Sequence, residues 1–243
     1  MHSERFLISS NEVDPFLRLS IPSLFRLLQA IATSGVAEIG AGKEETTDKG
    51  YLWVITRMQV EIERLPSYME EIALTTYPGE RVGFFYFRHF YAKDEKGELL
   101  FKASSSWALL KQETHEPVLR PPFPSPLPIE SLPDQLGRPE KLQKPTSFTE
   151  CEKRKITYSM CDLNGHLNNT RYLEMIVDAF PRPFHAENVL SSIVLNFEKE
   201  IQEGEEVECF LSPLGDRAFF VQGKANGEER FLAKLVFKAR GEE

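Results

Sequence analysis

The chain has 243 residues, a length that suits one large domain or two ordinary ones. A hydrophobic content of 41% is ample for a packed core, and a net charge of −8 argues against nucleic-acid binding, which requires a basic surface. Three cysteines without close pairing indicate a reducing compartment, with neither a disulfide framework nor a zinc site. Because no signal segment or membrane-length apolar run is present, we expect a cytoplasmic protein without membrane contact.

The first half predicts a strand, a helix and then an antiparallel series of strands. Ser20 and Pro22 mark the helix start, and leucines and Ile31 follow at spacings of three and four. Glycines between Gly35 and Gly42 end the helix. The entry strand is predicted over residues 5–10, and four further strands over 51–63, 71–77, 82–93 and 99–110.

A proline-rich segment separates the two halves. Nine of the sixteen prolines lie between Pro117 and Pro145. Such a stretch can form neither a helix interior nor a central strand, so it is interpreted as an extended, semi-rigid linker.

The second half repeats the order of the first. A strand is predicted over residues 155–160 because Ile156, Tyr158 and Met160 alternate with polar residues, and a mostly buried helix over about 168–180. Further strands are predicted over 191–201, 205–212, 217–225 and 230–240. Local matches at offsets of 130 and 135 suggest an internal repeat, and a trial offset of 148 sets Asp14 against Asp162.

A polar stretch, residues 161–170, falls between the predicted strand and the buried helix. Its asparagines and threonine suit helix capping, and its Asp and Asn suit turns around Gly165. A calcium loop is rejected because the glycine comes too early and position twelve is Leu173 rather than Glu. Acidic, amide and imidazole side chains are costly to bury without a function, so the stretch is also the leading candidate for a functional site.

The pattern Asp162-x-Asn164-x-His166-x-Asn168-Asn169, followed by Tyr172 and an apolar helix, resembles the signature of the acyl-ACP thioesterases. That family also carries a Glu in a Phe/Tyr-x-x-Glu segment, and here Glu200 follows His166 by 34 residues. The resemblance implies a tandem hotdog fold of class α+β, each unit a long helix wrapped by a curved antiparallel sheet. Plant members place a Cys directly after this Glu, but Ile201 stands here, which rules out a cysteine nucleophile at that position.

The resemblance implies hydrolysis of fatty acyl-ACP in fatty acid biosynthesis, with Asp162, Asn164, His166 and Glu200 as the catalytic set. Either carboxylate could activate water or attack directly, and His166 could move protons near neutral pH. Asn164 could orient water or the thioester, and free N–H groups around residues 165–168 could stabilise the oxyanion. Neither a metal nor a cofactor is required.

Three units are predicted: an N-terminal hotdog over 1–116 that binds the acyl chain, a linker over 117–147, and a catalytic C-terminal hotdog over 148–243. Trp53, Met58 and Phe87 are selected as chain-contacting residues, although ordinary core packing is the favoured interpretation for each residue taken alone.

The expected partner is acyl carrier protein with its acyl chain on 4′-phosphopantetheine, and a homodimer is possible. Because that carrier is acidic, a basic cluster is expected to dock it. The candidates are Lys141, Lys144, Lys153, Arg154 and Lys155. Ordinary solvated surface is the competing interpretation. An acyl-CoA thioesterase, a hotdog hydratase and a non-catalytic acyl-thioester sensor remain alternative functions.

Overall fold

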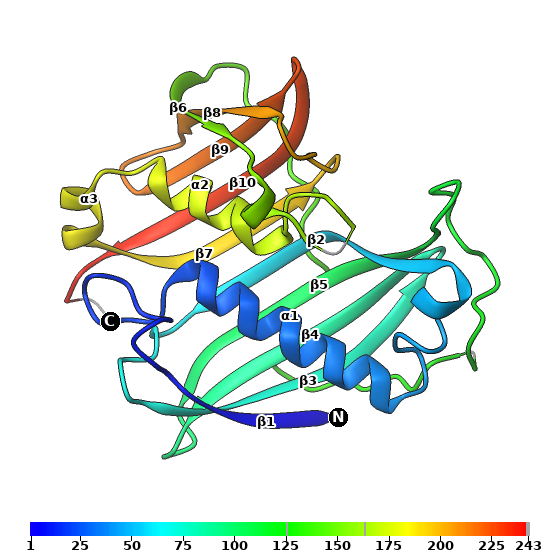
Figure 1. The fold of residues 1–243 in the computed structure, drawn as a ribbon. Helices are drawn as coiled ribbons and strands as arrows, with labels where there is room; N and C mark the ends of the chain where they lie inside the picture. Colours follow the sequence, from blue (N-terminus) through cyan, green and yellow to red (C-terminus); the bar gives the residue numbers. More distant parts are fainter. Residues whose placement is uncertain (125, 163, 242–243) are drawn as a thin grey trace.

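The computed structural model describes residues 1–124, 126–162 and 164–241. Its strands form one ten-stranded antiparallel sheet in the order β1-β3-β4-β5-β2-β7-β10-β9-β8-β6, with the helices on its concave side (Figure 1). The strands are β1 His2–Leu7, β2 Tyr51–Ile62, β3 Glu71–Val82, β4 Phe85–Asp94, β5 Leu99–Lys111, β6 Thr149–Lys155, β7 Asn188–Phe197, β8 Glu206–Pro213, β9 Ala218–Ala225 and β10 Glu228–Ala239. None of the helices in the described residues is both long and apolar enough to cross a bilayer.

The first unit wraps β1 to β5 around one long helix, α1 (Ile21–Glu38). The Ser20 side chain caps this helix by accepting the N–H of Ser23, as the sequence predicts. Leu24, Leu28 and Ile31 lie on the face toward the sheet and are fully buried. The helical periodicity of the sequence therefore reflects the real packing face.

The second unit has the same order but a shorter helix than predicted. A 3₁₀ turn over Asn169–Arg171 leads into α2 (Tyr172–Asp178), and the chain breaks before α3 (Arg182–Glu187). Pro181 and Pro183 explain the break, since proline lacks the N–H that a helix interior needs. Strands β6 to β10 surround these short helices.

The two units join through their sheets. Strands β2 and β7 pair antiparallel, with Met58 opposite Leu195 and Val60 opposite Ile193, and all four side chains are buried. One chain therefore forms a continuous sheet with the helices of both units on the same side, which is a tandem hotdog fold as predicted.

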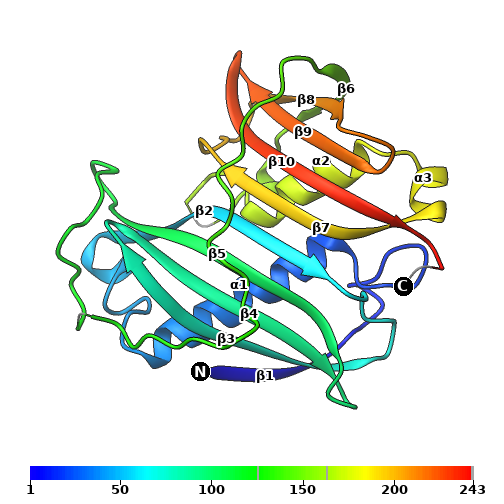
Figure 2. The same ribbon diagram turned by 180° about the vertical axis from the view of Figure 1, so that it is seen from behind.

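The proline-rich segment does more than connect the units. Described residues between 112 and 148 contain no helix or strand, and the segment runs across the convex face of the sheet (Figure 2). Leu136 and Leu142 are buried there, and the Leu142 N–H donates to Asn196 Oδ1 at 2.7 Å. Val118 and Phe123, by contrast, are buried against Trp53 and Tyr86 at the end of the first unit. The segment thus covers an apolar sheet face that would otherwise meet water.

The predicted strand over residues 155–160 is wrong, because the strand here, β6, covers Thr149–Lys155 and only Lys155 falls within the predicted range. Strand β6 ends at Lys155, and Tyr158–Met160 forms a 3₁₀ turn with Tyr158 82% exposed. Only Ile156 of the alternating residues is buried, because the chain turns here toward the start of the second helix.

Corresponding backbone hydrogen bonds in the loops that precede the two helices confirm the internal repeat. In the first loop the Asp14 N–H donates to Arg18 O at 2.7 Å, and in the second the Asp162 N–H donates to His166 O at 2.8 Å. Likewise the Leu19 N–H donates to Pro66 O and the Leu167 N–H to Ile201 O, both at 2.7 Å. These pairs follow the offsets of 148 and 135 found in the sequence.

Candidate active site

The polar stretch forms a tight loop whose backbone is held by its own aspartate. Asp162 Oδ1 accepts the Asn164 N–H at 2.8 Å, and Asp162 O accepts the Gly165 N–H at 3.0 Å. Gly165 has φ +77°, a left-handed conformation that glycine adopts without a Cβ penalty. The turn interpretation of these residues is therefore correct, but it leaves the second carboxylate oxygen of Asp162 available for other contacts.

The loop brings His166 beside Glu200. His166 Nδ1 lies 3.3 Å from Glu200 Oε2, and the two side chains are 27% and 45% exposed. An isolated bridge between His166 and Gln202 fixes the loop against the segment that carries Glu200. A carboxylate that accepts the Nδ1–H of a histidine leaves Nε2 free to accept a proton, the arrangement of a general base.

The start of the second helix offers fewer free donors than the sequence suggested. The N–H groups of Gly165, Leu167 and Asn168 donate within the protein, and Asn168 Oδ1 caps the Thr170 N–H at 3.0 Å. Among the described residues, the Asn169 N–H has no recorded acceptor and Asn169 lines the adjacent cavity. Three of the four N–H groups over residues 165–168 that were predicted to stabilise the oxyanion are therefore already used within the protein, and the Asn169 N–H is a further candidate.

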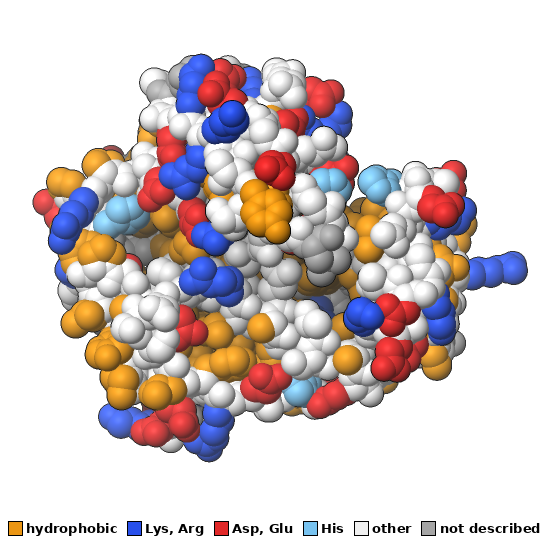
Figure 3. Space-filling model, viewed as in Figure 1, with side chains coloured by type: hydrophobic (Ala, Val, Ile, Leu, Met, Phe, Trp, Pro, Cys, Tyr) orange, Lys and Arg blue, Asp and Glu red, His pale blue; other side chains and the backbone are white. Residues whose placement is uncertain are grey.

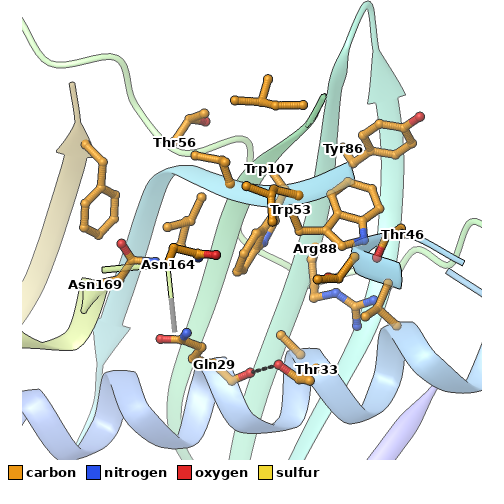
Figure 4. A pocket seen from close by; sticks show the side chains of 18 of the residues that line it. Gln29, Thr33, Thr46, Trp53, Thr56, Tyr86, Arg88, Trp107, Asn164 and Asn169 are labelled. Atoms are coloured by element: carbon orange, nitrogen blue, oxygen red, sulfur yellow. Dashed lines mark hydrogen bonds between the residues drawn. The ribbon is translucent and has the colours of Figure 1, made fainter. Parts of the chain in front are cut away.

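A cavity of about 710 Å³ opens beside this loop, within the roughly 300–1,000 Å³ usual for ligand sites. Asp162, Asn164, His166 and Glu200 all line it, so the structure brings the predicted catalytic set together. Figure 4 shows Asn164 and Asn169 at one end, with Gln29 and Thr33 of α1 below and Trp107 above. The cavity therefore lies between the two units, with the polar groups supplied by the second.

The other end of the cavity is formed by the first unit and contains a buried cation. Trp53, Tyr86 and Arg88 lie there (Figure 4). The Arg88 guanidinium donates to Thr76 Oγ1 at 3.1 Å and has no carboxylate partner among the described residues. Burial lowers the pKa of Arg88 to about 10, so it remains charged at neutral pH. Sequence reasoning missed Arg88, although an Arg within an apolar strand was a visible signal.

The three predicted chain-contacting residues have different positions. Trp53 lines the cavity and donates from Nε1 to Ala41 O at 2.9 Å. Met58 is a correction: it lies outside the large cavity, buried at the β2–β7 junction beside a minor one. Phe87 borders the cavity, but its ring lies on the convex face, because successive side chains of a strand point to opposite faces of the sheet. There the ring lies 5.4 Å from the Arg138 guanidinium.

The first unit keeps the loop but lacks its chemistry. At the same offsets, Phe16 replaces Asn164, Arg18 replaces His166 and Leu65 replaces Glu200. Arg18 pairs with Asp14 at 2.9 Å instead of serving a cavity. Trp107 of the first unit lines the open cavity. Its counterpart at the offset of 130, Phe237, packs into an aromatic cluster that fills the corresponding space in the second unit. The cluster contains Phe180, Phe184, Phe219 and Phe237.

The predicted basic cluster is largely paired with acids from distant parts of the chain. Lys144 pairs with Glu229 at 3.2 Å, Lys153 with Glu208 at 2.7 Å, and Arg154 with Asp178 at 2.7 Å. These acids come from neighbouring strands and α2. Lys141 and Lys155 are exposed and have no recorded carboxylate partner among the described residues.

The described residues favour neither a reactive cysteine in the polar stretch nor a metal centre. Burial, Glu203 and Asp162 raise the pKa of Cys161, the cysteine within the polar stretch, so its thiolate is disfavoured. In residues 1–124, 126–162 and 164–241, no group of three or more His, Cys, Asp or Glu is arranged to hold a metal ion.

A tandem hotdog fold with a polar loop facing an apolar cavity defines a class of proteins that act on acyl thioesters. Comparison with known proteins identifies the family within this class. The model of the acyl-ACP thioesterase N-terminal domain matches residues 1–120, and that of the C-terminal domain matches residues 143–242. The chain belongs to the acyl-ACP thioesterase family.

Individual relatives agree with this assignment. An acyl-ACP thioesterase structure from Bacteroides thetaiotaomicron superposes with a TM-score of 0.82 at 25% identity, covering 98% of this chain and 97% of that one. A chloroplastic palmitoyl-acyl carrier protein thioesterase from Gossypium hirsutum is 28% identical over 82% of this chain, and an oleoyl-acyl carrier protein thioesterase from Arabidopsis thaliana is 24% identical over 87%. The matches span 51% and 62% of those two plant chains.

Proposed function

We propose that the protein hydrolyses fatty acyl-ACP to a free fatty acid and holo-ACP, as a step of fatty acid biosynthesis in the cytoplasm. The observation that carries the proposal is the His166–Glu200 pair at 3.3 Å, which lies at the polar end of an otherwise largely apolar cavity. Membership of the family and the names of the relatives support acyl-ACP as the substrate.

In this proposal water is the nucleophile. Glu200 accepts the His166 Nδ1–H, and Nε2 removes a proton from water as its oxygen attacks the thioester carbonyl carbon. The Asn164 amide and the Asn169 N–H stabilise the negative charge on the carbonyl oxygen. The carbon–sulfur bond then breaks, and the imidazolium returns the proton to the pantetheine thiolate.

The acyl chain occupies the cavity, extending from Asn169 along α1 toward Trp53 and Arg88. Apolar surface there removes the chain from water, which supplies binding free energy without chemistry. The first unit thus binds the chain and the second performs the reaction, as the sequence resemblance implied. The carrier docks at the catalytic end, and Lys141 and Lys155 are the candidate contacts that retain free charge.

The choice of carrier is tested by measuring kcat/KM with acyl-ACP and acyl-CoA of the same chain length. The proposal requires a clear preference for acyl-ACP that falls as salt is raised, because exposed charge contacts are screened over about 8–10 Å near physiological ionic strength. Equal or better hydrolysis of acyl-CoA would reassign the protein as an acyl-CoA thioesterase. Binding without hydrolysis of either would make it a sensor.

A further inference from the structure

The carboxylates that line the large cavity all belong to the second unit. Among the described residues they are Asp162, Glu198 and Glu200. The first unit contributes no carboxylate to the described part of the wall but four basic side chains, those of Lys43, Arg81, Arg88 and His115. Figure 3 shows the surface hollowed between the two units on this side of the molecule. The cavity therefore has its carboxylates at the catalytic end and an excess of bases at the far end.

Two of these bases are satisfied without a ligand. Lys43 pairs with Asp48 at 2.5 Å, and both side chains reach solvent. Arg81 is partly exposed and donates to Gly83 O and Leu119 O, both at 2.9 Å. Neither residue needs an anion in the cavity.

Arg88, by contrast, is buried and makes little use of its donors. The residue is 7% exposed, and among the described residues only its Nη1 has a recorded acceptor, Thr76 Oγ1. Nε and Nη2 form the edge of the planar guanidinium that can bind a carboxylate through two parallel hydrogen bonds. Figure 4 shows Arg88 at the far end of the cavity wall. A buried cation is costly unless an anion completes its contacts.

Helix α1 makes room for this cation. A Cβ on Gly35 would lie 3.0 Å from Arg88 Nη1 and 2.9 Å from Thr76 Cγ2, so a glycine stands where the guanidinium packs on the helix. Glycine is unfavourable inside a helix relative to alanine. The chain therefore accepts a local cost that allows the cation to lie at this place.

Nearby carboxylates of the first unit do not pair with Arg88. His2 lies beside Gly35, and its two ring nitrogens lie 2.6 Å from Glu4 Oε1 and 2.7 Å from Glu38 Oε1. Hydrogen bonds to Glu4 and then Glu38 raise the pKa of His2, so both carboxylates favour its cationic form. Neither has a recorded ion pair with Arg88. The positive charge of Arg88 is thus available to a ligand in the cavity.

The length of the cavity suits a linear chain that reaches this cation. Gln29 lies at the catalytic end (Figure 4), and Gly35, on which Arg88 packs, lies further along α1. At 1.5 Å of rise per residue, these two positions are about 9 Å apart along the helix axis. Because a carbon–carbon single bond is about 1.5 Å long, roughly seven methylenes cover this distance.

We propose that the cavity accepts acyl chains that end in a carboxylate, so that ω-carboxyacyl thioesters are substrates of this protein. They are the half-thioesters of α,ω-dicarboxylic acids. The thioester reacts at the catalytic end, and the ω-carboxylate accepts hydrogen bonds from Arg88 at the far end. The proposal rests on the proposed function for the hydrolysis itself, and Arg88 acts only in binding and specificity.

The test compares acyl-ACPs of about 8–12 carbons that end in a carboxylate, in its methyl ester or in a methyl group. Wild type should hydrolyse the ω-carboxylate form with a kcat/KM at least about tenfold above that of the methyl ester. Arg88→Met should abolish this preference through KM, because the ω-carboxylate does not react. Arg88→Lys, which keeps the charge but not the planar edge, should retain part of it. The matched control Arg81→Met removes another cation from the cavity wall and should keep the wild-type ratio.

Calorimetric binding of free α,ω-dicarboxylic and monocarboxylic acids of equal length tests the same contact without catalysis. Wild type should bind the dicarboxylic acid at least about tenfold more tightly, and Arg88→Met should not. Hydrolysis of methyl-ended chains without any preference for the ω-carboxylate would overturn this proposal and leave the proposed function intact. Calorimetric preference without hydrolysis of any acyl-ACP would support the carboxylate site and refute the proposed function. A preference that is lost in Arg81→Met but kept in Arg88→Met would overturn the assignment to Arg88.

Discussion

Replacing Glu200 by glutamine tests whether the His166–Glu200 pair acts through charge. The variant keeps the shape and an oxygen acceptor but removes the carboxylate that would stabilise a histidine as it gains a proton. Across 3.3 Å, a unit charge pair is worth about 1.3 kcal/mol in bulk water and about 5 kcal/mol at an effective dielectric constant near 20. Because the Glu200 side chain is 45% exposed, we expect the lower part of this range, about 1.5–3 kcal/mol.

That loss corresponds to a fall in kcat/KM of roughly 10–150-fold. The assay is steady-state release of thiol from acyl-ACP, repeated with a small acyl thioester that has no protein carrier. Glu198→Gln is the matched control, since it removes the same charge from the cavity rim without contacting His166 in any recorded ion pair. An equal loss in both variants, or none in Glu200→Gln, would refute the role of the pair. Stability should hardly change, because an exposed ion pair contributes little.

Three further predictions concern packing and burial. Arg88→Met removes a buried cation without a carboxylate partner, so it should raise the free energy of unfolding in urea by about 1 kcal/mol. It should also lower the KM for longer saturated chains. A destabilised variant would contradict this prediction. Gly223→Ala should lower the free energy of unfolding in urea by about 1–3 kcal/mol, because the new Cβ would lie 1.9 Å from the Phe231 ring. Gly215→Ala, which has open space around it, should leave the free energy of unfolding unchanged. Burial raises the pKa of Cys209 to about 12, so at pH 8 its thiol should resist Ellman's reagent until the chain unfolds, and rapid reaction in the native protein would disprove that burial.

Most of the fold was predictable because its elements have clear periodicity and the chain repeats itself. The Ser20 cap, the apolar face of α1 and most strands of both units, though not β6, could be derived from the sequence. The repeat was detectable only through a few loop residues, yet those loops share their hydrogen bonds, since backbone geometry persists where side chains have changed.

The errors arise where tertiary contacts override local pattern. Residues 156–160 alternate like a strand, but a chain that must turn into a helix leaves Tyr158 in solvent. Met58 was selected without knowledge of the β2–β7 junction that buries it. The face on which the Phe87 ring lies depends on strand register, which the sequence did not supply.

The candidate site was predictable as a set but not as a mechanism. The resemblance to the acyl-ACP thioesterase signature implied Asp162, Asn164, His166 and Glu200 as one set, and the structure places all four on one cavity. The basic cluster could not be judged from the sequence, because the acids that neutralise it come from neighbouring strands and α2. Arg88 stands in the sequence as a base within an apolar strand, but its lack of a carboxylate partner among the described residues is visible only in the packed structure.

In the proposed reaction, His166 drives hydrolysis of an acyl thioester carried by ACP. The most direct measurement is the release of free fatty acid from purified acyl-ACP, followed by mass spectrometry for wild type and His166→Ala at equal concentration. We expect free acid and holo-ACP in equal amounts from wild type. The variant should keep its fold, as judged by circular dichroism, and should react at a rate at least about 10²-fold lower. Intact acyl-ACP after prolonged incubation with wild type, or an undiminished rate in His166→Ala, would contradict it.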